Sequence, residues 1–224
     1  MINNGPHNEN VLIERYKYIG GSDLPTILSL SEYNNIWELA RVKAQIIDLP
    51  FTGNRFTTNG NLMEPQVRNY MNETYGFNFI EDTIIDNNRM YRGNCDGIDR
   101  NYKSLLEVKT FLNKLKVNYY TPQCQFYMEV FDVPVCLLVG YHTNDNFYVG
   151  EIGNLEQELD DNYFDSHFDS SRLQIVRIFR NKDYFNKIEK RIKLFQYLVD
   201  ILKNNKNMTE KEFYNIYYSK ILNR

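Results

Sequence analysis

The chain has 224 residues, of which 42% are hydrophobic and 15% aromatic, and its formal net charge is −3. This apolar content suffices for a folded core, so we expect one domain over residues 1–224, with residues 1–10 flexible. The three cysteines have no CxxC spacing, which excludes a disulfide framework or a structural zinc site, and no apolar run is long enough to span a membrane. We therefore expect a soluble protein of a reducing intracellular compartment.

The charge balance alone does not identify the partner. Lys and Arg number 26 against 29 Asp and Glu, which counts against nucleic acid because phosphate binding depends on basic side chains. A basic groove can nevertheless be outweighed by acids elsewhere in the chain. Residues 153–174 form such an acidic segment, which would cap a sheet edge, contact a partner or mimic nucleic acid.

The N-terminal part is predicted to be helical. Ser22 is a suitable N-cap for a short helix over Asp23–Leu30. Asn35 with Glu38 three residues later resembles a capping box, which predicts a second helix through about Gln45.

A third helix is predicted to start near Asn61–Glu64, because Pro65 then lies in its first turn, where its missing N–H is tolerated. Gly76 would end this helix. Its buried face is predicted to consist of Val67, Tyr70, Met71 and Tyr75.

The middle of the chain changes to a period of two, which is typical of strands. The predicted strands are Phe77–Ile85, Met90–Asp99, Leu105–Thr110, Val135–Tyr141, Phe147–Ile152 and Ile175–Phe179. The fourth and fifth would pair through a turn at residues 142–146, and Pro122 would open a helix through about Phe131. The C-terminal part is predicted to be an amphipathic helix with one apolar face, formed by Ile188, Ile192, Phe195, Val199 and Leu202. This order predicts an α/β or α+β fold with helices flanking one mixed sheet.

The segment NCDGIDRNYKSLLEVKT, residues 94–110, carries the candidate chemistry. A period of two places Glu107 and Lys109 on one face of a strand, with Val108 facing the opposite way. A hairpin would bring Asp96 of the preceding strand beside Glu107. Two carboxylates at one place favour a hard divalent cation such as Mg²⁺ between them. The alternative is a surface hairpin whose acids and lysine form weak ion pairs.

Four sequence blocks, in order, resemble the phage-type nucleases of the YqaJ and lambda-exonuclease group within the PD-(D/E)xK superfamily. The blocks are IGGSDLPTIL (19–28), GNLMEP (60–65), NCDGI (94–98) with LEVKT (106–110), and YYTPQCQFYMEV (119–130). The resemblance implies a restriction-endonuclease-like core and an Mg²⁺-dependent nuclease, with Mn²⁺ as a substitute metal. Cys95 stands where the family often has proline, and the acidic segment 153–174 is longer than in the group.

The resemblance also assigns roles to single residues. It implies that the metal is bound by Glu64, Asp96, Glu107 and the carbonyl of Val108. Lys109 matches the catalytic lysine, which would orient or deprotonate a water or stabilise the phosphate in the transition state. Gln123 matches a glutamine near the active site, whereas Gln125, about 200° further around a helix, is expected to face elsewhere.

Arg15 and Ser22 match a pair that binds the 5′-terminal phosphate in lambda-type exonucleases, and the planar guanidinium group of arginine suits a phosphate. The alternatives are a surface arginine and a simple N-cap. Lys114 and Lys116 are candidates for DNA-backbone contacts, and Tyr120 for stacking in a DNA channel. A solvated loop and core packing explain these three residues equally well.

By this resemblance we expect a 5′→3′ exonuclease of double-stranded DNA in recombination or replication, located in the cytoplasm of a bacterial or phage-infected cell. A homotrimer and a single-strand annealing protein are the expected assembly and partner, by analogy alone. Two other functions stay open. One is an endonuclease of the same fold in defence or DNA processing. The other is an inactive module that binds DNA or protein.

Overall fold

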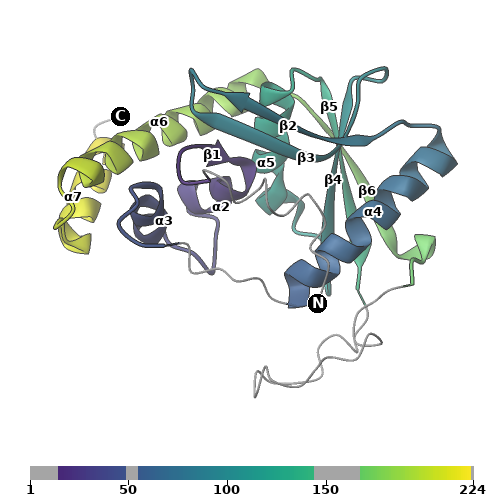
Figure 1. Cartoon of the computed structure of the whole chain (residues 1–224), viewed down its shortest axis with the longest axis horizontal. Coiled ribbons are helices and arrows are strands. Elements are labelled where there is room, and N and C mark those ends of the chain that lie inside the picture. The colour runs from purple at the N-terminus through teal and green to yellow at the C-terminus, as the bar shows by residue number, and fades with distance from the viewer. Residues whose placement is uncertain (1–14, 49–54, 144–166, 223–224) are drawn as a thin grey trace, which may run out of the picture.

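The computed structural model describes residues 15–48, 55–143 and 167–222. Within these residues a mixed six-stranded sheet forms the centre of the molecule, and helices lie on both of its faces (Figure 1). The predicted α+β fold, with helices flanking one mixed sheet, is therefore confirmed. The strands are β1 (Ile19–Gly20), β2 (Ile80–Asp86), β3 (Tyr91–Asp99), β4 (Ser104–Phe111), β5 (Val135–His142) and β6 (Leu173–Phe179).

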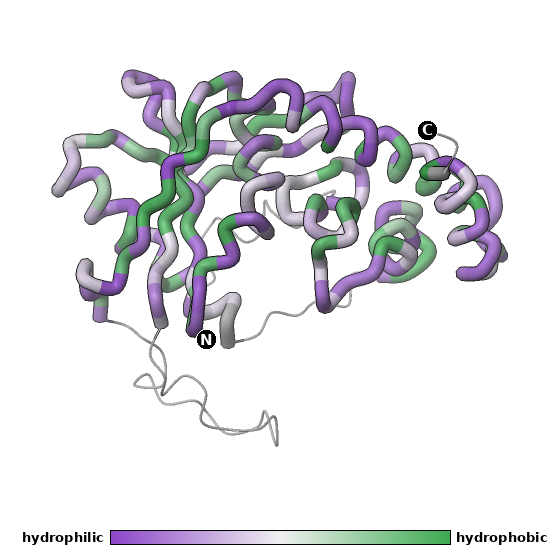
Figure 2. The backbone as a smooth tube through the Cα atoms, turned by 180° about the vertical axis from the view of Figure 1, so that it is seen from behind, coloured by the Kyte–Doolittle hydropathy of each residue, from purple (hydrophilic) through white to green (hydrophobic). Residues whose placement is uncertain are grey.

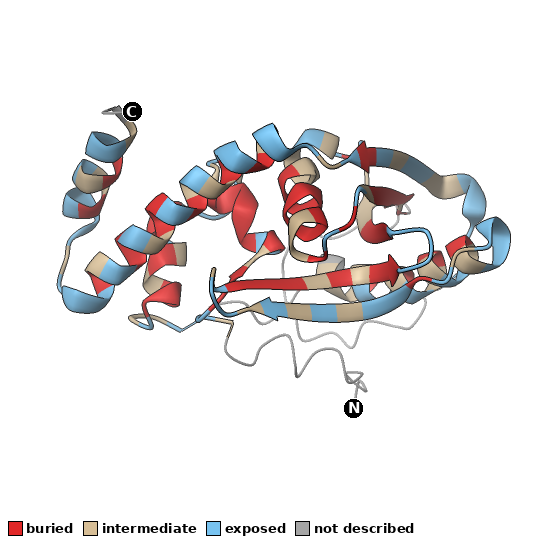
Figure 3. Cartoon of the chain, turned by 90° about the horizontal axis from the view of Figure 1, so that it is seen from above, coloured by how far each residue is buried: buried red, intermediate tan, exposed pale blue. Residues whose placement is uncertain are grey.

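The strands follow the order β1-β3-β4-β5-β6, and β2 pairs with β3 outside this path. β1 runs parallel to β3 and β4 runs parallel to β5, whereas the other pairs are antiparallel. A parallel pair needs a crossover connection, which α5 supplies between β4 and β5. Figure 3 shows the exposed β2 lying beside the largely buried β3.

The helices divide between the two faces of the sheet. α5 contacts β3, β4, β5 and β6 and is backed by α6, whereas α4 packs against β4 from the opposite face. Figure 2 shows hydrophobic stretches along the central strands and a mostly hydrophilic exterior on the C-terminal helices. The helices are η1 (Gly21–Asp23), α2 (Leu24–Ile27), α3 (Ile36–Lys43), α4 (Arg55–Tyr75), α5 (Val117–Val130), η4 (Ser170–Arg172), α6 (Lys182–Asn204) and α7 (Glu210–Leu222).

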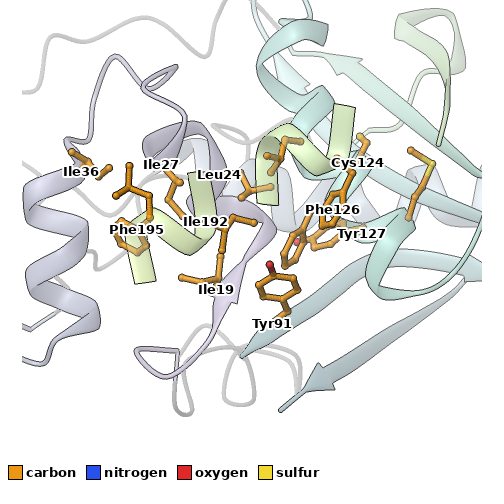
Figure 4. Close-up of a cluster of buried hydrophobic side chains, with 14 of the residues drawn as sticks. Ile19, Leu24, Ile27, Ile36, Tyr91, Cys124, Phe126, Tyr127, Ile192 and Phe195 are labelled. Carbon is orange, nitrogen blue, oxygen red and sulfur yellow. The ribbon is translucent and has the colours of Figure 1, made fainter. Parts of the chain in front are cut away.

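In the described parts of the chain, two apolar clusters form the core, one on each face of the sheet. The larger joins the N-terminal segment, β3, α5 and α6, and Figure 4 shows Ile19, Tyr91, Phe126 and Ile192 within it. The smaller lies between α4 and the sheet, around Met63, Val67, Leu106 and Val139. The predicted apolar face of the C-terminal helix is buried as expected, with Ile192, Phe195 and Leu202 fully inaccessible.

The start of the first helix differs from its prediction. Ser22 is not the N-cap, because the short helix η1 already begins at Gly21 with Gly20 as its cap. The Asp23 carboxylate accepts a hydrogen bond from the Gly20 amide at 2.8 Å, which leaves the Ser22 hydroxyl exposed. The cap at Asn35 is confirmed, since its side chain accepts a hydrogen bond from the Glu38 amide at 2.8 Å.

Both proline-based helix starts were predicted too late. α4 begins at Arg55, so Pro65 lies inside the helix, and α5 begins at Val117, so Pro122 lies inside as well. A proline in a helix removes one N–H donor, but tertiary packing of an apolar face outweighs that local cost.

The C-terminal half of α4 packs largely as predicted. Val67 and Met71 are buried against the sheet, and Tyr70 packs at the margin of the same cluster. Tyr75 was wrongly predicted to be buried, because it is the last helical residue and 53% of it is exposed. Gly76 adopts a φ of 72°, the left-handed conformation that ends a helix.

Phe147–Ile152, the predicted partner strand of β5, cannot be placed beside it, because both sides of β5 are occupied by other strands. Residues 147–152 lie outside the described residues, as do residues 1–10 and most of the acidic segment. β5 instead pairs with β4 on one side and β6 on the other. The end of the segment 153–174 is structured, because it contains η4 and the first residues of β6. In the described part of the chain, no helix is long and apolar enough to cross a bilayer.

Candidate active site

A β-bulge shapes the strand that carries Asp96. β2 and β3 pair at Ile80↔Ile98 and again at Asp82↔Cys95, so two steps along β2 match three steps along β3. The extra residue falls at the Asp96–Gly97 step, and a bulge of this kind re-aims a side chain. Only glycine fits at position 97, because an added Cβ would lie 2.8 Å from the Cβ of Phe79.

The hairpin of β3 and β4 brings the predicted carboxylates together. Asp96 Oδ2 accepts a hydrogen bond from the Val108 amide at 2.6 Å, so the Asp96 carboxylate reaches the neighbouring strand beside Glu107. Glu107 is only 1% exposed, and its Oε1 lies 2.5 Å from Lys109 Nζ. Its second oxygen, Oε2, is buried and has no hydrogen-bond partner among the described residues. A buried carboxylate oxygen without a donor is costly unless a cation or a proton occupies the site.

α5 supplies the amide that fixes Glu107. Gln123 Nε2 donates to Glu107 Oε1 at 2.7 Å and lies 3.2 Å from the hydroxyl of Tyr127. Gln125 points away, as predicted, and donates to the carbonyl of Phe179 at 2.8 Å. Tyr127 was not singled out from the sequence, although its spacing of four residues from Gln123 places both on one helix face.

α4 places a further carboxylate, that of Glu64, at the same centre as Asp96, Glu107 and Lys109. Glu64 Oε1 accepts a hydrogen bond from Arg68 Nη1 at 3.3 Å, and the same nitrogen lies 2.5 Å from the main-chain carbonyl of Asp96. Arg68 also forms an ion pair with Glu81 of β2. Sequence reasoning missed Arg68, and its only local signal was its position four residues after Glu64.

The electrostatics of this centre favour added positive charge. Burial, and then the nearby Asp96 carboxylate, raise the pKa of both Glu64 and Glu107 from an ordinary 4.5 to about 8. For Lys109, burial opposes protonation, but Glu107 and Asp96 outweigh it and raise its pKa well above the usual value. Lys109 therefore stays positively charged. Its single charge does not balance the carboxyl groups of Glu64, Asp96 and Glu107.

The predicted phosphate-binding pair, Arg15 and Ser22, belongs to a segment that packs against α5. Arg15 Nη2 donates to Ser22 Oγ at 3.2 Å, so these two side chains meet as expected. Gly21, next to Ser22 in the chain, packs tightly against α5, because an added Cβ would come within 2.6 Å of the Tyr127 ring and 2.9 Å of Gln123 Cγ. The segment that carries Arg15 and Ser22 is therefore in close contact with the helix that positions Glu107.

A buried lysine that sequence reasoning missed holds this segment in place. Lys43 is 3% exposed, and its Nζ lies 2.6 Å from Asp23 Oδ2. The same ammonium donates to the main-chain carbonyls of Arg15 at 2.9 Å and Tyr18 at 2.7 Å. Lys43 thereby fixes the backbone at Arg15 and at Tyr18, and its position 20 residues or more from its partners left no local signal.

These residues lie in a region that matches a known sequence family. The model of the YqaJ-like viral recombinase domain matches residues 12–134, more than half of the chain. The chain belongs to the YqaJ-like viral recombinase domain family. The predicted family is therefore confirmed, and Arg15, Ser22, Glu64, the β3–β4 hairpin and Gln123 all fall within the matched residues. No curated protein sequence matches the chain.

Solved structures share the fold of this YqaJ-like chain. A phage-related exonuclease from Haemophilus somnus 129PT has a TM-score of 0.64 and 20% identity, over 85% of this chain and 96% of the other. The alkaline exonuclease LHK-Exo from Laribacter hongkongensis has a TM-score of 0.63 and 18% identity, over 88% of this chain and 94% of its own. LHK-Exo in complex with dAMP gives a TM-score of 0.65 at 16% identity over the same shares. At these identities the similarity establishes a common fold.

The remaining candidates of the YqaJ-like domain are Tyr120, Lys114 and Lys116. Lys109 Nζ is 5.5 Å from the ring centroid of Tyr120, so this tyrosine borders the centre. Lys116 is exposed and forms an ion pair with Glu32 at 3.0 Å, and Lys114 is also exposed. The structure thus brings Tyr120 to the centre and leaves both lysines on the surface near the start of α5.

In this structure of the YqaJ-like domain, the carboxyl groups of the candidate site are bound by other groups of the protein. Arg68 bonds Glu64, the Val108 amide bonds Asp96, and Lys109 and Gln123 bond one oxygen of Glu107. Among the described residues, no three His, Cys, Asp or Glu side chains are gathered into a ready-made metal cluster. The carboxylate oxygens of Glu64, Asp96 and Glu107 are nevertheless the type of ligand that a hard divalent cation prefers.

Proposed function

We propose that this chain is a metal-dependent deoxyribonuclease that acts as a 5′→3′ exonuclease on double-stranded DNA in recombination or replication. The observation that carries the proposal is the convergence of Asp96, Glu107 and Lys109 at the β3 bulge, with Arg15 and Ser22 on a segment whose Gly21 packs against the helix that positions Glu107. The names of two neighbours of the same fold, a phage-related exonuclease and an alkaline exonuclease, support this activity.

The residues fit a hard divalent cation such as Mg²⁺, with Mn²⁺ as a substitute. The buried Oε2 of Glu107, which has no partner among the described residues, and the raised pKa values of Glu64 and Glu107 support a bound cation at this site. We propose that Glu64, Asp96, Glu107 and the Val108 carbonyl hold the cation. Such a cation, when bound, lowers the pKa of a water and offsets negative charge on a phosphoryl oxygen.

The chain's own groups would act on the phosphate and its surroundings. Because the pKa of Lys109 is raised, this lysine would serve as a fixed cation and hydrogen-bond donor rather than as a base. Gln123 would hold Glu107 in place through its 2.7 Å hydrogen bond. Tyr120, which borders the candidate active site beside Lys109, would contact the bound DNA strand. Lys114 and Lys116 would contact the DNA backbone further from this site.

Replacing Arg15 by alanine is expected to remove most of the preference for a 5′-phosphorylated end. Arg15 already lies against Ser22, and a charge-assisted hydrogen bond contributes about 1.5–3 kcal/mol, so the preference should fall by about tenfold or more. The measurement is the ratio of initial rates on 5′-phosphorylated and 5′-hydroxyl duplexes. Lys17→Ala is the control, since it removes an exposed positive charge from the same segment two residues away, and its ratio should match the wild type.

Mg²⁺ is expected to stabilise the protein more at pH 9 than at pH 6. The pKa values of Glu64 and Glu107 are raised to about 8, so the stability that their protonated forms contribute is complete below pH 4.5 and is lost as the pH rises through 8. Cation binding needs the ionised forms and offsets that loss. The Tm difference between Mg²⁺ and EDTA should grow by on the order of 5 °C between the two pH values. An equal Mg²⁺ effect at both pH values would contradict these assignments.

The first test of the function is degradation of three DNA substrates with Mg²⁺ or with EDTA. They are a linear duplex with 5′-phosphates, the same duplex with 5′-hydroxyls, and a closed circle. We expect Mg²⁺-dependent loss of the linear phosphorylated duplex and none of the circle. Cutting of the circle would favour an endonuclease. Binding of DNA without cleavage would favour an inactive module.

We also propose, by family resemblance, that the protein works in the cytoplasm of a bacterial or phage-infected cell with a single-strand annealing protein. A homotrimer that encloses the duplex would keep the enzyme on its substrate. Light scattering coupled to size exclusion tests the trimer, because a mass of one or two chains would contradict it.

A further inference from the structure

Arg68 connects three elements around the candidate active site. Its Nη1 donates to Glu64 Oε1 on its own helix and to the main-chain carbonyl of Asp96 on β3, and its Nη2 pairs with Glu81 on β2. The side chain is 12% exposed, so the guanidinium group is mostly withdrawn from water. One planar group thus contacts two proposed metal ligands and an acid outside the centre.

Glu81 lies directly opposite the bulge. It is the residue of β2 between Ile80 and Asp82, whose partners on β3 are Ile98 and Cys95. The residues of β3 that face Glu81 are therefore Asp96 and Gly97. A bulge leaves part of the strand ladder unpaired, and the Arg68 hydrogen bond to the Asp96 carbonyl supplies a donor there.

A lysine at position 68 could not make this set of contacts. Arginine presents several N–H donors in a rigid plane, whereas lysine is a single charged point on a flexible chain. The simpler explanation is an ordinary surface ion pair, which contributes little. Asp82 on β2 and Arg100, directly after the end of β3, form such a pair, with Arg100 62% exposed.

We infer that Arg68 and Glu81 form a positioning clamp that holds the β3 bulge and thereby aims the Asp96 carboxylate at the metal-binding position. Arg68 holds the main-chain carbonyl of Asp96. The Val108 amide holds the Asp96 carboxylate through a hydrogen bond of 2.6 Å. Arg68 also sets the position of Glu64, so both proposed ligands depend on one guanidinium group. Neither Arg68 nor Glu81 touches the substrate. The inference rests on the proposed function, because it assigns these residues to the same metal site.

The test compares Arg68→Lys and Glu81→Gln with Arg100→Gln as the matched control. Metal-free proteins are titrated with Mn²⁺ by calorimetry, and the hydrogen exchange of the Val108 amide is measured without metal. Loss of an outer partner of a metal ligand lowers metal affinity by about 10–100-fold, and we expect this for Arg68→Lys and about tenfold for Glu81→Gln. Both should exchange the Val108 amide faster than the wild type. Arg100→Gln should match the wild type within about twofold in both measurements.

Mn²⁺ affinity within about twofold of the wild type in Glu81→Gln would overturn the clamp. Glu81 is 34% exposed on an edge strand, so this variant decides the matter even if Arg68→Lys fails to fold. If the wild-type protein binds Mn²⁺ and degrades DNA, and the variants behave like the wild type, the clamp is refuted and the proposed function stands. A wild-type protein that neither binds Mn²⁺ nor degrades DNA refutes the proposed function itself.

Discussion

Replacing Lys109 by alanine is expected to lower the rate of DNA cleavage by about 10²–10⁴-fold while DNA binding and the fold are retained. Lys109 Nζ lies 2.5 Å from Glu107 Oε1 and, at 24% exposure, is the more accessible member of that pair. It can therefore meet a phosphate while Glu107 stays buried. Its raised pKa keeps it charged throughout the working pH range. The measurement is the single-turnover rate on linear duplex DNA at saturating Mg²⁺.

Lys187→Ala is the control for the loss of a positive charge, since Lys187 is exposed on the outer side of α6. Its rate should equal that of the wild type. Removing Lys109 also removes the cation that lowers the pKa of Glu107, so any residual activity should need a higher pH. A Lys109→Ala protein that cleaves within about threefold of the wild-type rate would exclude Lys109 from the chemistry.

The carboxylates of β3 and β4 could be located from the sequence because their placement depends on local rules. Alternation along a strand puts Glu107 and Lys109 on one face, and a short turn returns the chain beside Asp96. The structure confirms this arrangement, with the Asp96–Val108 hydrogen bond at 2.6 Å. Gln123 was placed near the active site through the family resemblance, and in the structure it donates a hydrogen bond to Glu107.

The supporting residues could not be predicted because their contacts join distant parts of the chain. Arg68 reaches the carbonyl of Asp96, 28 positions away, and Lys43 reaches the carbonyl of Arg15, also 28 positions away. The bulge itself depends on the register of β2 against β3, which no local pattern specifies. A surface-type residue such as arginine or lysine gives no sign in the sequence that it will be buried.

The error at β5 has a related cause. Two apolar strands with a polar turn between them indicate a hairpin, which is the commonest local solution. β5 instead lies parallel to β4 and antiparallel to β6. A parallel pair forms only after α5 has crossed over the sheet, so its partner is chosen by the packing of the helix and not by the turn.

Replacing Asp96 by asparagine is expected to lower cleavage by on the order of 10³-fold, because metal-assisted catalysis contributes several kcal/mol of transition-state stabilisation. The asparagine oxygen can still accept the hydrogen bond from the Val108 amide, so the fold should remain. What is lost is the negative charge at the bulge. Mn²⁺ affinity, measured by calorimetry, should fall together with the cleavage rate.

Asp99 provides the comparison, since it is an aspartate on the same strand with a structural role. It is 1% exposed and accepts hydrogen bonds from the amides of Asn78, Asn101 and Tyr102. Burial opposes its ionisation, but these amides outweigh it and lower the pKa of Asp99. Asp99→Asn should therefore cost about 1–2 kcal/mol of stability and leave the cleavage rate of the folded protein unchanged. If Asp96→Asn instead lost stability and kept Mn²⁺ affinity and activity, Asp96 would belong with Asp99 as a residue that holds the turn.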